Sequence, residues 1–202
     1  MSFASSLQEQ QQEESVRILY PRHVPVTTVE TVNEAVQAIE NHYCLNDNDD
    51  NDHFVGGMGE SDPGVGIVGG SNGNEPLLLD AWLLTETIQR VQQARHGIPF
   101  SIYTSGMVVH NDDNDNDEEV LLETLRHFDS IRVSLLAANP MDFAKETAAV
   151  QQDDGFGRVC QFLVLAQEAS LPIEVCVLQK HASAARELAM SLGARQVHVY
   201  NE

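Results

Sequence analysis

Five short, almost wholly apolar runs alternate with helical patterns along the chain, and this alternation limits the possible fold more than any other feature. The runs are VGIV (65–68), FSIYTSG (100–106), SIRVSLLA (130–137), PIEVCVL (172–178) and QVHVY (196–200). Strands that are apolar on both faces are typical of parallel sheets buried under helices. The alternation therefore predicts an α/β fold with a mostly parallel sheet of about five strands, covered by helices.

Apolar residues between these runs recur at the spacing of helices. Thr27 and Glu30 fit a capping box that opens a helix reaching roughly His42. A second helix is expected from Ala81 to shortly before Gly97, which is a suitable helix stop. The remaining patterns predict helices around 120–126, 159–166 and 185–192, and a broken helix within 140–154.

Polar stretches mark the organisation of the chain around these elements. Residues 1–15 are rich in Gln and Glu and are expected to be disordered, whereas residues 16–202 are expected to form a single domain. Acidic low-complexity insertions are expected at about 44–64 and 110–119. The first contains Asp and Asn at EF-hand spacing, but Asp52 and Met58 occupy the positions that require glycine and glutamate. The second fails in the same way, so no metal site is predicted.

Charge and cysteine content limit the possible partners and the compartment. The formal net charge is −20, which argues against nucleic acid and anionic membranes as partners. No apolar run approaches the roughly 20 residues that span a bilayer, and the first residues do not resemble a secretory signal. Cys44, Cys160 and Cys176 are odd in number, and the last two lie within apolar patterns. These features predict free thiols and an intracellular, cytoplasmic location.

The carboxyl ends of the first three expected strands carry polar residues. These segments are GGSNGNEP after the first strand, TSG after the second and AANP after the third. Ligands of parallel α/β sheets gather at this edge, so we expect a site for a small-molecule ligand there. A glycine-rich strand-to-helix connection that binds nothing is the alternative.

These strand ends resemble those of the radical S-adenosylmethionine (radical SAM) superfamily. Gly73-Asn74-Glu75-Pro76 resembles its GGEP element, Thr104-Ser105-Gly106 resembles its TNG element, and VSLLAANP resembles the strand that follows. The segments FGRVCQFLVLAQEASLPIEVCVL and ARELAMSLGARQVHVY are similar to the tail of the TatD-associated branch. The resemblance covers about residues 65–201.

The resemblance implies a partial (β/α) barrel, with helices on the outside, that binds S-adenosylmethionine at its top. It implies that Gly73, Asn74 and Glu75 contact the methionyl amine and that Ser134 and Asn139 lie near the ribose. Thr104 belongs to the same implied cofactor site. Asn74 departs from the family by replacing its second glycine, and Glu75 has the alternative role of a helix cap.

The family also implies a [4Fe-4S] cluster, whose ligands are absent from this sequence. The family binds it through a CxxxCxxC loop after its first strand, whereas the corresponding segment here, ILYPRHVPVTT, has no cysteine. Either the chain is a catalytically silent relative, or an amino-terminal segment is missing from the sequence. The sequence therefore leaves open an enzyme and a non-catalytic binding or scaffold module. Exposed sheet edges would also suit a partner chain or a second copy.

Overall fold

The computed structural model describes residues 27–43, 64–68, 75–78, 81–94, 97–108, 115–147 and 155–201. The expected disordered amino-terminal stretch, 1–15, lies outside the described residues, as does the first expected insertion except for Gly64.

The strands form one parallel sheet in which sequence order and spatial order coincide, β1-β2-β3-β4-β5. They are β1 (Val65–Ile67), β2 (Phe100–Thr104), β3 (Ser130–Ser134), β4 (Ile173–Leu178) and β5 (Gln196–Tyr200). Each neighbouring pair is parallel; Ile102 pairs with Ile131, and Val133 with Val175. The sheet does not close on itself, with β1 and β5 as its edges. The predicted α/β fold, a partial barrel with a parallel sheet of five strands, is confirmed.

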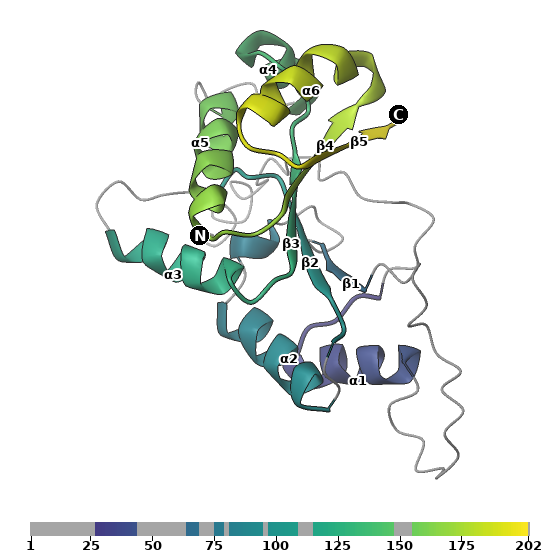
Figure 1. The fold of residues 1–202 in the computed structure, drawn as a ribbon. Coiled ribbons are helices and arrows are strands. Elements are labelled where there is room, and N and C mark those ends of the chain that lie inside the picture. The colour runs from purple at the N-terminus through teal and green to yellow at the C-terminus, as the bar shows by residue number, and fades with distance from the viewer. Residues whose placement is uncertain are drawn as a thin grey trace, which may run out of the picture.

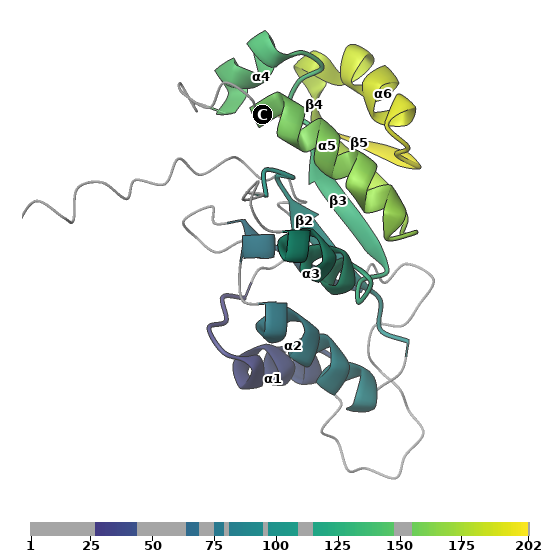
Figure 2. The same cartoon turned by 90° about the vertical axis from the view of Figure 1, so that its left-hand side faces the viewer.

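The helices that connect the strands cover one face of this sheet, whereas the first helix packs against the second. The helices are α1 (Val32–His42), α2 (Ala81–Ala94), α3 (Asp115–Leu125), α4 (Pro140–Thr147), α5 (Gly155–Glu168) and α6 (Ala182–Ser191), with short 3-10 turns η1 (Pro76–Leu78) and η2 (Gln179–His181). Right-handed crossovers between strands in unbroken order place every connecting helix on the same side. Figures 1 and 2 show α2, α3, α5 and α6 on that side. We call the side with the helices the outer face and the opposite side the inner face.

The hydrophobic core lies between the outer face and the helices. Strand residues Ile102, Ile131, Val133 and Val175 are fully buried there. Their helical counterparts, also buried, include Ile88, Val91, Leu125, Val159, Phe162 and Leu163. A Cβ atom at Gly106 would lie 3.1 Å from Val133 Cγ1 and 3.2 Å from Phe162 Cδ1, so α5 packs closely against the ends of β2 and β3.

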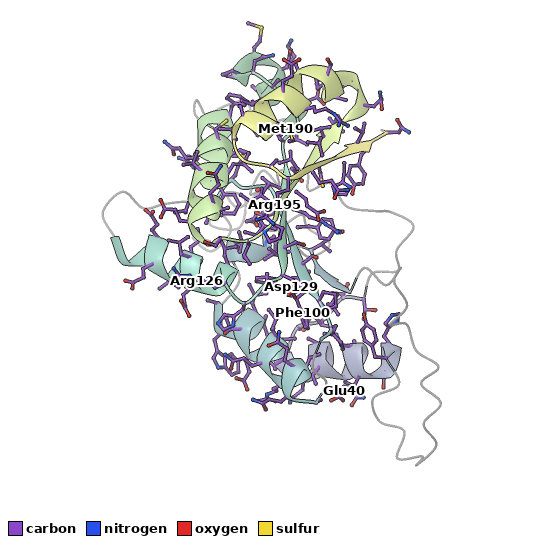
Figure 3. All side chains as sticks on the ribbon, in the orientation of Figure 1. Glu40, Phe100, Arg126, Asp129, Met190 and Arg195 are labelled. Atoms are coloured by element: carbon purple, nitrogen blue, oxygen red, sulfur yellow. The ribbon has the colours of Figure 1, made fainter. Side chains whose placement is uncertain are left out.

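A side chain also fixes the amino edge of the sheet. Phe100 N donates to Asp129 Oδ2 at 2.8 Å, and Asp129 N donates to Phe100 O at 2.8 Å (Figure 3). Asp129 therefore aligns the starts of β2 and β3, on which the register of the inner-face residues depends.

Two predicted helix positions differ from the structure. Helix α1 has Thr31 as its N-cap and Glu34 in the reciprocal capping position, so the predicted capping box at Thr27 and Glu30 is wrong. The sequence has the same Thr-x-x-Glu spacing twice, and the helix uses the copy beside Val32, which is buried. Helix α3 begins at Asp115, inside the second expected insertion, because no glycine or proline there ends it. The broken helix expected within 140–154 is helix α4, followed by α5 from Gly155.

Among the described residues, no helix combines the length and the apolar character needed to cross a membrane.

Candidate functional site

Glu75 connects the carboxyl ends of the first two strands. Its Oε2 accepts hydrogen bonds from Ser105 N at 2.8 Å and from Ser105 Oγ at 2.5 Å. Its Oε1 accepts from Leu77 N at 3.2 Å, so the side chain also caps η1. Glu75 is only 9% exposed, and a buried carboxylate needs such charge-assisted hydrogen bonds. The carboxylate thus joins the start of η1 to the turn that follows β2.

The turn after β2 is built from its own hydroxyl groups. Gly106 N donates to Thr104 Oγ1 at 2.9 Å, and Met107 N donates to Ser105 Oγ at 3.1 Å. Gly106 has φ +73°, a left-handed conformation that glycine adopts without strain. Thr104 is fully buried and pairs with Val133, so its side chain belongs to the outer face and shapes the turn.

Ser134 and Asn139, the two residues expected near the ribose, lie in different environments. Ser134 is the last residue of β3, pairs with Cys176 and is 1% exposed. Asn139 is exposed and caps α4: its Oδ1 accepts from Asp142 N at 2.9 Å, and its Nδ2 donates to Asp142 Oδ2 at 2.9 Å. The capping bonds fix the orientation of the Asn139 side chain at the start of the helix.

Four of the predicted cofactor residues can therefore be placed. Glu75, Thr104, Ser134 and Asn139 all follow or end strands of one parallel set, which puts them at the same edge of the sheet. Among these segments, the contact between Glu75 and Ser105 joins the one after β1 to the one after β2. Gly73 and Asn74 lie outside the described residues.

The inner face carries a polar network that the sequence reasoning did not identify. Arg132 Nε donates to Glu174 Oε2 at 2.8 Å, and His198 Nε2 lies 2.6 Å from the same oxygen. Arg132 Nη1 also donates to Tyr103 OH, and the guanidinium carbon lies 5.0 Å from the centre of the Tyr103 ring. These four side chains come from neighbouring strands β2 to β5 and form a row across the inner face, which we call the inner-face row.

Burial around this row holds several groups in their protonated forms. Burial raises the pKa of Tyr103 above its ordinary value. Burial lowers the pKa of Arg132, but Tyr103 and Glu174 raise it by more, so that the guanidinium stays positively charged. Cys176 is fully buried beside Tyr200, and burial raises the pKa of its thiol to about 12. The inner face therefore combines one permanent cation, one carboxylate and an imidazole with neutral phenols and a neutral thiol.

A sequence signal for the inner-face row was present. In a sheet, residues two apart share a face, and Arg132, Glu174 and His198 are each the one ionisable Arg, Glu or His within a strand that otherwise lacks Lys, Arg, Asp, Glu and His. A charged residue within a buried strand requires a partner. Pairing these residues across strands would have predicted the row, but it needs the strand register.

The described residues do not form the cluster site that the resemblance implies. Cys160 lies on α5 in the outer layer, whereas Cys176 lies on the inner face, so the sheet separates them. No group of three potential metal ligands occurs within the described ranges, and Cys44 falls outside them. These residues therefore do not fit a [4Fe-4S] cluster, which needs three neighbouring thiolates.

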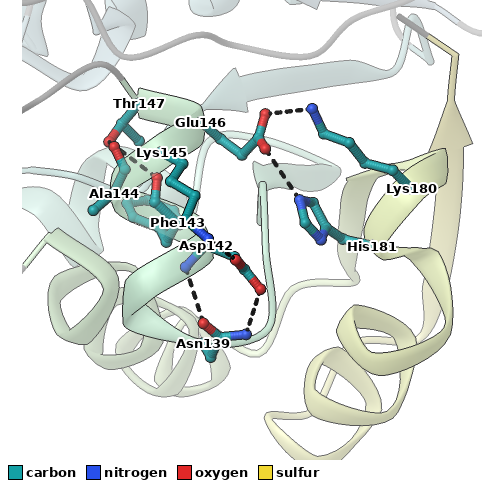
Figure 4. A network of polar contacts seen from close by, with 9 residues as sticks. All are labelled: Asn139, Asp142, Phe143, Ala144, Lys145, Glu146, Thr147, Lys180 and His181. Atoms are coloured by element: carbon teal, nitrogen blue, oxygen red, sulfur yellow. Dashed lines mark hydrogen bonds and ion pairs between the residues drawn. The ribbon is translucent and has the colours of Figure 1, made fainter.

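A second polar group joins α4 to the end of β4. Glu146 accepts from Lys180 Nζ at 2.8 Å and lies 3.1 Å from His181 Nε2 (Figure 4). Burial raises the pKa of Glu146, but the hydrogen bonds from Lys180 and His181 lower it by more, so that it lies below the ordinary value. This group ties helix α4, which Asn139 begins, to the turn η2 (Figure 4).

The chain matches no protein-family model and no curated protein at a significant level.

Proposed function

We propose that the chain is a binding module that takes S-adenosylmethionine, or a similar amino-acid nucleoside, at the carboxyl edge of its sheet without reacting with it. The contact between Glu75 and Ser105 carries this proposal, because it unites two loops whose sequences resemble elements of one cofactor site. Loops of parallel sheets bind ligands at this edge in many unrelated proteins. The resemblance supports the ligand class, and the shared sheet edge of Glu75, Thr104, Ser134 and Asn139 supports the location.

In this proposal Glu75 positions the loop and does not itself bind the amine. Its two oxygens already accept from Ser105 and Leu77, and both bonds hold the Glu75 side chain at the start of η1. The carbonyl groups of Gly73 and Asn74 then meet the amine, as the resemblance implies. Ser134 and Asn139, at the end of β3 and the start of α4, are proposed to approach the ribose.

The proposal assigns binding and not radical chemistry. That chemistry requires three thiolates that leave one iron open to the cofactor. The described residues supply no such set, and Cys160 and Cys176 are on opposite sides of the sheet. Anaerobic reconstitution with iron and sulfide is therefore expected to leave the protein colourless; a brown protein would support the enzyme instead.

The test is calorimetric titration of the whole chain with S-adenosylmethionine. We expect saturable binding, and we expect Glu75→Gln to weaken it about tenfold, since charge-assisted hydrogen bonds contribute about 1.5–3 kcal/mol. Glu123→Gln is the matched control, because Glu123 is an exposed glutamate on α3 whose removal changes the net charge equally. Folded wild-type protein that gives neither heat nor a thermal shift would refute the proposal.

A further inference from the structure

The inner-face row concentrates the charged residues of the sheet at one place. Among the five described strands, the only Lys, Arg, Asp, Glu or His residues are Arg132, Glu174 and His198. All three are in contact through one atom, Glu174 Oε2. Polar residues at unrelated positions would be enough to make the inner face hydrophilic. The contact of Arg132 and His198 with one oxygen of Glu174 therefore requires another explanation.

The inner-face row is not the arrangement that would stabilise the sheet most. The Arg132 and Glu174 side chains are only 18% and 17% exposed, and moving a charged group out of water is unfavourable. Apolar residues of similar size are often as stabilising as a buried ion pair, or more so. Packing alone therefore does not account for these residues on neighbouring strands.

Arg132 is held in place while part of its hydrogen-bonding capacity remains. A guanidinium has five N–H groups. Among the described residues, Arg132 uses one of them on Glu174 and one on Tyr103, and its guanidinium carbon lies 5.0 Å from the centre of the Tyr103 ring. The other three N–H groups have no acceptor within the described part of the chain, and a guanidinium fixed by two partners binds further acceptors with little loss of rotational freedom.

The remaining groups specify the class of ligand. Arginine only donates, so its partner must be an acceptor, and a planar guanidinium matches carboxylate and phosphate oxygens best. Glu174 is already shared by Arg132 and His198, which leaves His198 as a neighbouring polar group. The net charge of −20 repels large polyanions, so the anion must be small.

We infer that Arg132, held by Glu174 and Tyr103 on the inner face of the partial barrel, binds a small oxyanion, the carboxylate or phosphate of a low-molecular-weight ligand. No described helix covers this face (Figures 1 and 2), and His198 at its margin is 30% exposed. The site is separate from the edge at which Glu75 lies, and it does not depend on the function proposed for that edge.

The test is titration of the whole chain with inorganic phosphate and, separately, with malonate, at constant ionic strength set with sodium chloride. We expect saturable binding of at least one anion, with the stronger response separating a phosphate-type from a carboxylate-type ligand. Arg132→Gln should weaken binding at least tenfold. Arg195→Gln should change it less than twofold, although it removes the same charge, because Arg195 is exposed before β5 (Figure 3).

A second variant separates ligand binding from a merely structural role. Glu174→Gln removes the charge that neutralises Arg132, so it should tighten anion binding several-fold, whereas a structural ion pair would predict no gain. Arg132→Lys keeps the charge without the planar fork and should bind at an intermediate strength. Circular dichroism checks that each variant is folded.

The inference is overturned if the wild type shows no saturable binding of either anion. It is also overturned if Arg195→Gln weakens binding as much as Arg132→Gln, which would indicate a general charge effect. Neither titration uses the edge at which Glu75 lies, and Glu123→Gln, at an exposed residue of α3, should leave phosphate and malonate binding unchanged. A failure of S-adenosylmethionine to bind therefore does not affect this inference, and the two proposals fail separately.

Discussion

At the scale of single residues, the protein uses its few buried polar groups as connectors. Glu75 receives both polar hydrogens of Ser105, and Glu174 receives Arg132 and His198 on one oxygen. Each carboxylate links segments that lie far apart in the chain. Removing one partner would leave a poorly compensated buried charge, which costs about 3–5 kcal/mol in fully buried pairs.

Cys176 gives a prediction at this scale. Its thiol is fully buried and its pKa is raised to about 12, so almost no reactive thiolate exists at pH 8. We expect iodoacetamide to leave Cys176 unmodified in the native protein and to modify it rapidly in denaturant. Mass spectrometry of the digested protein measures both. Equal rates in the two states would mean that the inner face opens readily, contrary to this structure.

At the scale of elements, short polar contacts set the angles at which helices meet the sheet. Asn139 begins α4 and Glu146, near its end, reaches η2, so both termini of this short helix are fixed. An eight-residue helix is too short to be stable alone in water. Its position therefore depends on these contacts and on Phe143, which is buried.

Glu146 predicts a pH dependence for this element. Its folded pKa lies below the ordinary value, so its stabilisation is complete above that value, about 4.3, and is lost as pH falls through the folded pKa. We expect Glu146→Gln to lower the unfolding free energy by about 1 kcal/mol at pH 7. The difference from wild type should shrink between about pH 4.5 and pH 3.

Denaturant titrations at several pH values measure this difference. Glu123→Gln is the control, because its side chain is 64% exposed and its pair with Arg126 should contribute less than about 0.5 kcal/mol. A Glu146→Gln difference that stays constant down to pH 3 would contradict the assigned pairing.

At the scale of the whole molecule, the unbroken strand order produces a two-sided sheet with different chemistry on each side. All connecting helices pack on the outer face, which is apolar, and the inner face carries the row of Tyr103, Arg132, Glu174 and His198. The centre of the sheet is paired on both sides, whereas β1 and β5 each have one neighbour.

This arrangement predicts a gradient of local stability. Backbone amides of β2, β3 and β4 should exchange with deuterium most slowly, because their residues are largely buried and both their neighbours are strands. Strand β5 has exposed or half-buried residues throughout and should exchange faster. Hydrogen exchange with mass spectrometry measures this order. Protection of β5 equal to that of β3 would indicate that another chain covers this edge.

The sequence by itself determined the order of strands and helices, the parallel sheet and the polar edge at its carboxyl ends. These features follow from periodicity within ten to twenty residues, because a helix and a strand repeat their apolar residues at different spacings. Local ambiguity still shifted the start of α1, where Thr27 and Thr31 offer the same capping pattern.

Only the tertiary structure decided which side chains meet. Arg132 and Glu174 are 42 positions apart, and Glu174 and His198 are 24 apart, so their contact depends on strand register and not on any local pattern. The same register turned Thr104 toward the core, and the turn after β2 brought Ser105 to Glu75. A one-residue slip would place every strand side chain on the opposite face, which is why the pairing decides the chemistry of the inner face.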